Sequence, residues 1–160
     1  MLLTSVATKA VRHIFDKNFT PGTLRNVFSQ NVLLLTRLKT EGKMKDFQHC
    51  LLFSKEEPDS QKFDAQLMTC ILEEFHIQTI IQLDRSVLSG LWNIKKYRNN
   101  VAHSNTTDFS NVCTNQIWDE ISMAVKALGE DALCQECIDL RVATLQSSNE
   151  EMTFHIRSVL

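Results

Sequence analysis

The sequence contains few residues that interrupt helices. Only four glycines and two prolines occur among its 160 residues, whereas residues of high helix propensity are abundant. Hydrophobic residues make up 43% of the chain and charged residues 22%, which are ordinary values for a folded domain and argue against both disorder and a coiled coil. A chain of this length is expected to form one domain with a sizeable buried core. The composition therefore predicts an all-α domain.

The sequence also lacks a long hydrophobic run. No segment approaches the roughly 20 uninterrupted apolar residues of a membrane span. The first helical segment carries Lys9 and Arg12 within its apolar stretch rather than ahead of it, which predicts an amphipathic helix and not a secretory signal. The cysteines are odd in number and scattered, at positions 50, 70, 113, 134 and 137, a distribution typical of reduced thiols inside the cell. We therefore expect a cytoplasmic protein without membrane contact.

A broadly basic charge is absent as well. The formal net charge is −2; residues 1–50 carry eight Lys or Arg against three Asp or Glu, and residues 51–160 carry nine against sixteen. Proteins that bind nucleic acid non-specifically over their whole surface are strongly basic. That class is excluded, so any site for an anion has to be local.

The spacing of the apolar residues predicts about six helices. They are expected at residues 2–17, from Thr20 to Gly42, from Ser60 to about 75, at about 86–103, at about 110–129 and at about 131–146, with at most one short helix between 43 and 59. The candidate N-caps are Thr20, Ser60, either Asp84 or Ser86, and either Asp108 or Ser110. The segment that begins at His76 is rich in β-branched residues, and it could end a helix or form an extended connection. Gly129 stands where a left-handed residue ends a helix, and residues 147–160 form a polar tail.

One stretch, KKYRNNVAHS at residues 95–104, departs from the amphipathic pattern. On the helix at 86–103, the buried stripe is predicted to consist of Val87, Leu91, Ile94 and Val101. Arg98 is in phase with this stripe, so its side chain is expected at the edge of the core. Asn99 and His103 are four residues apart and therefore share one helical face, together with Trp92, Lys95 and Lys96.

These residue types suit work on a phosphodiester. Arg98 offers a planar, permanently charged fork for phosphate oxygens, and His103 titrates near neutral pH and can move a proton. The two side chains are about 140° apart around a regular helix. They can meet on one phosphate only if the helix loosens at its end, or if each meets its counterpart on a partner chain. The pattern predicts no metal site.

The motif R-N-x-x-x-H near the end of a long helix resembles the HEPN superfamily, the higher eukaryote and prokaryote nucleotide-binding domains. The flanking pieces RHIFDKNFTPGTL, QKFDAQLMTCIL and QIWDEISMAVKALG are similar to the animal branch found in the DAZ-interacting zinc-finger protein, an E3 ubiquitin ligase, and in related multidomain receptors. The resemblance implies an up-and-down bundle of about five to six helices that dimerises through the motif helix. It assigns residues 1–130 to the HEPN-like domain and 131–146 to an additional helix packed on it.

Catalytic members of the family are metal-independent endoribonucleases that leave a 2′,3′-cyclic phosphate. By this resemblance, His103 would act as general acid and base, Arg98 would stabilise charge on the phosphoryl group, and Asn99 would orient one of them. Lys95 and Lys96 would contact the RNA, and the protein would be a homodimer. The reaction would need no cofactor or metal. Some members associated with nucleotidyltransferases have a tyrosine two residues after the histidine. Asn105 stands there instead, so that subtype is not supported.

Several alternatives remain open at the sequence level. The domain could be a non-catalytic module that dimerises or recruits protein partners in a ubiquitin ligase or an innate sensor, with Arg98 and His103 serving only to end a helix. A nucleotide pocket is a minor option because no glycine-rich phosphate loop occurs. Trp92 and Tyr97 are interpreted as core or dimer-contact aromatics rather than platforms on which RNA bases stack. The pair Cys134 and Cys137 is interpreted as structural thiols rather than half of a zinc site.

Overall fold

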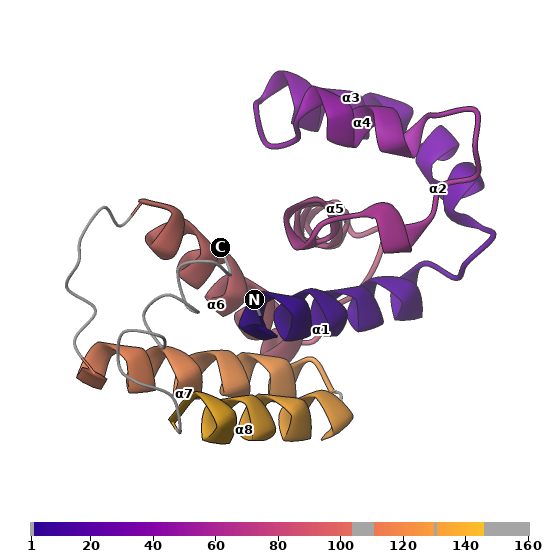
Figure 1. The fold of residues 1–160 in the computed structure, drawn as a ribbon. Helices are drawn as coiled ribbons and strands as arrows, with labels where there is room; N and C mark the ends of the chain where they lie inside the picture. Colours follow the sequence, from indigo (N-terminus) through magenta and orange to yellow (C-terminus); the bar gives the residue numbers. More distant parts are fainter. Residues whose placement is uncertain (1, 104–110, 130, 146–160) are drawn as a thin grey trace. The chain divides into compact units, whose positions relative to one another are not determined.

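The computed structural model describes residues 2–103, 111–129 and 131–145. Within these ranges the chain forms eight α-helices and one 3-10 helix, with no β-strand (Figure 1). Their bounds are α1 Leu2–Asn18, α2 Leu24–Gln30, α3 Val32–Thr40, α4 Asp46–Leu52, η1 Ser60–Lys62, α5 Ala65–Ile77, α6 Arg85–His103, α7 Asn111–Ala127 and α8 Asp131–Leu145. The predicted all-α fold is confirmed.

The helices form two compact units. One unit comprises Val11–Leu83, and the other comprises Met1–Ala10 together with Asp84–Leu160. Helix α1 contributes to both of them. No helix in the described ranges is long and apolar enough to cross a membrane.

An aromatic cluster forms the core of the unit at Val11–Leu83. The ring of Phe15 lies 4.8 Å from that of Phe19 and 5.8 Å from that of Phe63, and Phe19 meets Phe75 edge-on at 5.4 Å between ring centroids. These are favourable aromatic geometries, and all four side chains are buried. Beside this cluster, the Arg12 guanidinium donates hydrogen bonds to the carbonyl oxygens of Ser60 and Phe63, which fixes η1 against α1.

The single helix predicted from Thr20 to Gly42 is wrong, because the chain breaks into α2 and α3 at Asn31. The Asn31 side-chain amide donates to the carbonyl of Val27 at 2.8 Å, while its backbone N–H bonds the carbonyl of Phe28 instead. The Asn31 side chain thus binds the carbonyl that the Asn31 backbone N–H would bind in a continuous helix. Asparagine readily competes with the backbone in this way. The predicted end of this segment is correct, since Gly42 adopts a φ of +75° just after α3.

The predicted start of the next helix at Ser60 is also wrong. Ser60 begins the 3-10 helix η1, and Asp64 is the N-cap of α5, accepting from the backbone N–H of Leu67 at 2.7 Å. Gln48, only 1% exposed, donates to both carboxylate oxygens of Asp64 and accepts from the backbone N–H of Lys45. This buried amide joins the start of α4, the one short helix that was predicted, to the start of α5.

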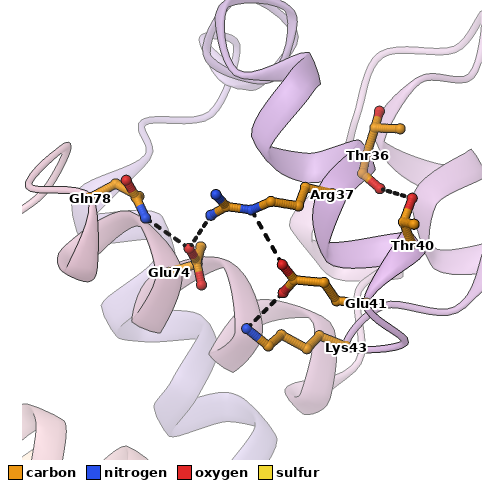
Figure 2. A network of polar contacts seen from close by, with 7 residues as sticks. All are labelled: Thr36, Arg37, Thr40, Glu41, Lys43, Glu74 and Gln78. Carbon is orange, nitrogen blue, oxygen red and sulfur yellow. Dashed lines mark hydrogen bonds and ion pairs between the residues drawn. The ribbon is translucent and has the colours of Figure 1, made fainter.

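A second polar network joins α3 to α5 (Figure 2). Glu74 is 7% exposed and accepts from the Arg37 guanidinium at 2.8 Å and from the Gln78 amide at 3.1 Å. Glu41 lies between Arg37 and Lys43, at 3.6 and 2.9 Å, and the hydrogen bond from Lys43 lowers the pKa of its carboxyl group. A buried carboxylate requires such partners, so this network fixes where α3 lies on α5.

In the other unit, α6, α7 and α8 have the predicted extents. Gly129 adopts a φ of +89° after α7, as predicted for the end of that helix. Helix α8 packs along α7 (Figure 1), where an ion pair joins Arg141 to Asp119. Lys9 at the start of the chain also binds the Glu136 carboxylate at 2.8 Å. The domain boundary at residue 130 stays a prediction, and the tail at 147–160 lies outside the described residues.

Candidate functional site

Helix α6 carries the motif residues. It begins after Asp84, whose carbonyl accepts from the backbone N–H of Leu88 at 3.0 Å, which favours Asp84 over Ser86 as the first cap. Gly90 lies against Ala124 and Ala127 of α7 and against Leu128 just after it, so the two helices approach each other closely near the start of α6. The helix then continues through His103. The motif therefore stands more than one turn beyond this close approach.

The inner stripe of α6 is close to the predicted one. Leu91, Ile94 and Tyr97 are buried, and Val87 is half-buried. Arg98 is also half-buried, which confirms its position at the edge of the stripe. The side chains of Val101 and His103 lie outside the part of the chain that the structure describes, so their predicted orientations stay predictions.

The outer face of α6 is basic and aromatic. Trp92, Lys95, Lys96 and Asn99 are all exposed, as expected for residues that share a polar face. The Lys96 ammonium lies 5.3 Å from the ring centroid of Trp92 and 5.5 Å from that of Tyr97, within the range of cation–π attraction. Tyr97 is buried, which agrees with its interpretation as a core aromatic. Trp92 is 57% exposed, so the core interpretation is wrong for this residue, and its contact with a second chain stays a prediction.

The charge of α6 differs from that of the helices beside it. From Arg85 to His103 the helix contains four Lys or Arg and no Asp or Glu. The described residues of α7 and α8 contain five acidic side chains, Asp119, Glu120, Asp131, Glu136 and Asp139, against Lys126 and Arg141. A local basic surface therefore exists in a chain of slightly negative net charge, as the sequence requires of any anion site.

The helix geometry bears on how the motif residues could work together. Helix α6 is helical through His103, and positions five residues apart on a regular helix are about 140° apart around its axis. Loosening of the helix between Arg98 and His103, one of the two predicted ways for both to reach one phosphate, is not observed in the backbone. The other way, in which each residue meets its counterpart on a partner chain, stays a prediction.

No metal site was found in the described ranges, where no three His, Cys, Asp or Glu side chains come together. Cys137 of α8 is 1% exposed, and burial raises the pKa of its thiol to about 11. A thiol with so high a pKa is a poor metal ligand and a poor nucleophile. This supports the interpretation of Cys134 and Cys137 as structural; the side chain of Cys113 lies outside the described part.

Comparison with known protein families identifies the family of this chain. The model of the DZIP3/hRUL138-like HEPN family matches residues 21–153, which include the motif and most of the described helices. The chain belongs to this HEPN family. Comparisons with curated proteins and with solved structures found no match. The match of the HEPN model extends past residue 130, so it covers α8 together with the motif helix.

Sequence reasoning placed Trp92 on the polar face of the motif helix but also interpreted it as a core or dimer-contact aromatic, so its exposure was only partly predicted. The signal for exposure was its helical phase, four residues before Lys96 and seven before Asn99. The close approach of Gly90 to α7 was not predicted. The packing role of Gly90 had no comparable signal, because it depends on where α7 crosses.

Proposed function

We propose that this HEPN domain acts on RNA as a metal-independent endoribonuclease, at a composite site built from Arg98, Asn99 and His103 of two chains. The observation that carries this proposal is the pairing of half-buried Arg98 with exposed Asn99 on a basic helix that contains no acidic residue. A side chain held at the edge of the core is positioned more firmly than a freely exposed one. Arg98 can thus present a fixed guanidinium to a phosphate.

The reaction consistent with these residues needs no cofactor. The ribose 2′-hydroxyl attacks the adjacent phosphorus, and His103 of one chain accepts the hydroxyl proton. The bond from phosphorus to the 5′ oxygen breaks, and the imidazole, now protonated, returns its proton to this leaving oxygen. Arg98 neutralises the growing charge on the phosphoryl oxygens, and Asn99 orients the groups by hydrogen bonding. The products are a 2′,3′-cyclic phosphate and a 5′-hydroxyl.

Lys95 and Lys96 supply the local contact with the RNA backbone. Both lie about two turns before the histidine, on the exposed side of α6. Contacts with phosphates displace bound counterions, so binding should weaken steeply as salt is raised. Few such contacts are available here, and the dependence on salt should be shallower than for a protein with a broad basic surface.

The second chain is a copy of the first. A homodimer with two-fold symmetry places identical elements opposite one another, and this brings together the arginine and histidine that one regular helix holds apart. We therefore propose a homodimer in which the ends of the two α6 helices border one RNA-binding cleft.

The direct test is RNA cleavage in EDTA. The 160-residue protein is incubated with single-stranded and structured RNA, in parallel with His103→Ala and with the matched control His49→Ala, which removes a histidine of the other unit. We expect cleavage by the unmodified protein and by His49→Ala, loss of at least about a hundredfold in rate for His103→Ala, and a cyclic phosphate by mass spectrometry. Absence of cleavage, or equal cleavage by His103→Ala, rejects the catalytic proposal.

A further inference from the structure

Trp92 is the prominent feature of the motif helix that the proposed reaction does not use. Its side chain is 57% exposed, whereas its neighbours Leu91 and Ile94 are buried. Tryptophan usually buries its large ring and leaves only the indole N–H near water. An indole left mostly in water, on the same face as Lys96 and Asn99, indicates a surface that a partner covers.

The charge around Trp92 indicates what kind of partner this is. The exposed face also carries Lys95 and Lys96, and Arg98 lies at its border. In a two-fold contact through this face, each patch would meet its own copy, and these cations would oppose one another at a cost. A partner with negative charge and flat apolar faces complements the surface instead, and single-stranded nucleic acid has both properties.

We propose that Trp92 is a stacking platform for an unpaired base of the RNA, with Lys96 contacting the phosphate of that nucleotide. This rests on the proposed function, since it assumes that RNA runs along α6 toward the motif. Trp92 and His103 are eleven residues apart, roughly 16 Å along the helix axis. The stacked base is therefore a few nucleotides from the bond that is cut.

The platform selects single-stranded or looped RNA. In a duplex both faces of an internal base are covered by its neighbours, so an indole can stack only on a base that is splayed out or unpaired. Lys96 already lies over the Trp92 ring at 5.3 Å. Its flexible side chain can move from the ring to a phosphate while the ring accepts a base.

Binding to an uncleavable RNA separates this proposal from catalysis. A fluorescent single-stranded oligonucleotide with 2′-O-methyl groups cannot react, because the attacking hydroxyl is blocked. We expect Trp92→Ala to weaken its binding about tenfold or more and Trp92→Phe to weaken it much less. The same sequence as a duplex should bind weakly to the unmodified protein and to both variants.

Phe47 provides a matched control. Its ring is also 57% exposed and lies beneath a lysine, Lys45, at 5.9 Å, but it belongs to the other unit. Phe47→Ala should bind the oligonucleotide as the unmodified protein does. An equal loss for Phe47→Ala and Trp92→Ala would mean that exposed aromatics act non-specifically, and would overturn the proposal.

Intrinsic fluorescence gives a second readout. The chain has two tryptophans, and Trp118 is buried, so Trp118→Phe leaves Trp92 as the sole indole. Stacking of a base on Trp92 should quench its emission as single-stranded oligonucleotide is added. Binding without quenching would contradict the platform.

The outcomes distinguish this proposal from the proposed function. If His103→Ala abolishes cleavage while Trp92→Ala binds and cleaves normally, the stacking proposal is rejected and the catalytic proposal is supported. If no cleavage occurs but Trp92→Ala still loses binding, the catalytic proposal is rejected and the stacking proposal is supported. If Trp92→Ala converts a dimer into a monomer by light scattering, Trp92 lies between two chains, and the platform is overturned.

Discussion

A Cβ atom added to Gly90 would lie 3.0 Å from the carbonyl oxygen of Ala124. The same atom would also lie 3.3 Å from a methyl group of Leu128. Glycine in the middle of a helix is unfavourable by about 1 kcal/mol relative to alanine, so its presence here is best explained by this close approach. Gly90 lets the start of the motif helix approach α7 closely. This contact constrains the direction of the helix axis along which Arg98 and Asn99 lie.

Gly90→Ala should therefore destabilise the protein although alanine favours a helix. The added methyl group meets backbone, which cannot rotate away, and overpacking of this kind costs about 1–3 kcal/mol. After the gain of about 1 kcal/mol in helix propensity, we expect a net loss of up to about 2 kcal/mol in the free energy of unfolding, measured with urea. Ser89→Ala, at an exposed neighbouring position, is the control and should be neutral or slightly stabilising. A Gly90→Ala protein more stable than the parent would refute the close packing of α6 on α7.

The buried carboxylate of Glu74 gives a second prediction. Arg37→Ala removes its charged partner at 2.8 Å and leaves the Gln78 amide as the hydrogen-bond donor to Glu74 among the described residues. We expect a loss of about 1–3 kcal/mol in the free energy of unfolding. The loss should be smaller in a Glu74→Gln background, because a neutral amide needs no cation.

The control for this pair is Lys62→Ala. Lys62 binds Glu56 at the same distance, 2.8 Å, but both side chains are more than half exposed. Exposed ion pairs contribute little, so the denaturation midpoint should not move measurably. Equal costs for Arg37→Ala in both Glu74 backgrounds would show that the two side chains are not coupled.

The thiols of Cys137 and Cys50 should differ in reactivity. Burial raises the pKa of Cys137 to about 11, and Cys50 is exposed. At about pH 8, iodoacetamide should modify Cys137 at least about tenfold more slowly than Cys50, as read by peptide mass spectrometry. Equal labelling of the two cysteines in folded protein would contradict the burial of Cys137.

The raised pKa of Cys137 also makes the stability of the protein depend on pH. Because the folded pKa exceeds the usual value of 9.0, the protonated thiol favours the fold below about pH 9. This contribution is lost as the pH rises from about 9 toward 11.

Regular periodicity is the part of this fold that the sequence predicts well. The extents of helices α1, α6, α7 and α8 agree with prediction to within about two residues. The break at Asn31 was not predicted, because Leu24, Phe28, Leu35 and Leu38 are buried in α2 and α3 at spacings that also fit one continuous helix. The spacing of apolar residues carries no information about a side chain, such as that of Asn31, that takes the hydrogen-bond acceptor of its own backbone N–H.

The candidate site is predictable to a similar degree. Helical phase alone placed Arg98 at the edge of the core and Asn99 on the exposed face, because both depend only on the period of the helix. The same phase placed Trp92 on the exposed face, whereas the general tendency of large aromatics to be buried favoured the core. Its 57% exposure shows that helical phase was the better guide.

The composite nature of the site is the central claim, and mixing two inactive variants tests it directly. Arg98→Ala and His103→Ala should each be inactive, because each dimer lacks one residue type at its site. When the two proteins are mixed and allowed to exchange chains, heterodimers contain both an arginine and a histidine from opposite chains. The account predicts that the mixture recovers up to roughly a quarter of the parent cleavage rate, from statistical pairing in a two-fold dimer. A mixture that exchanges chains by light scattering or energy transfer, yet cleaves no faster than its two components, would contradict it.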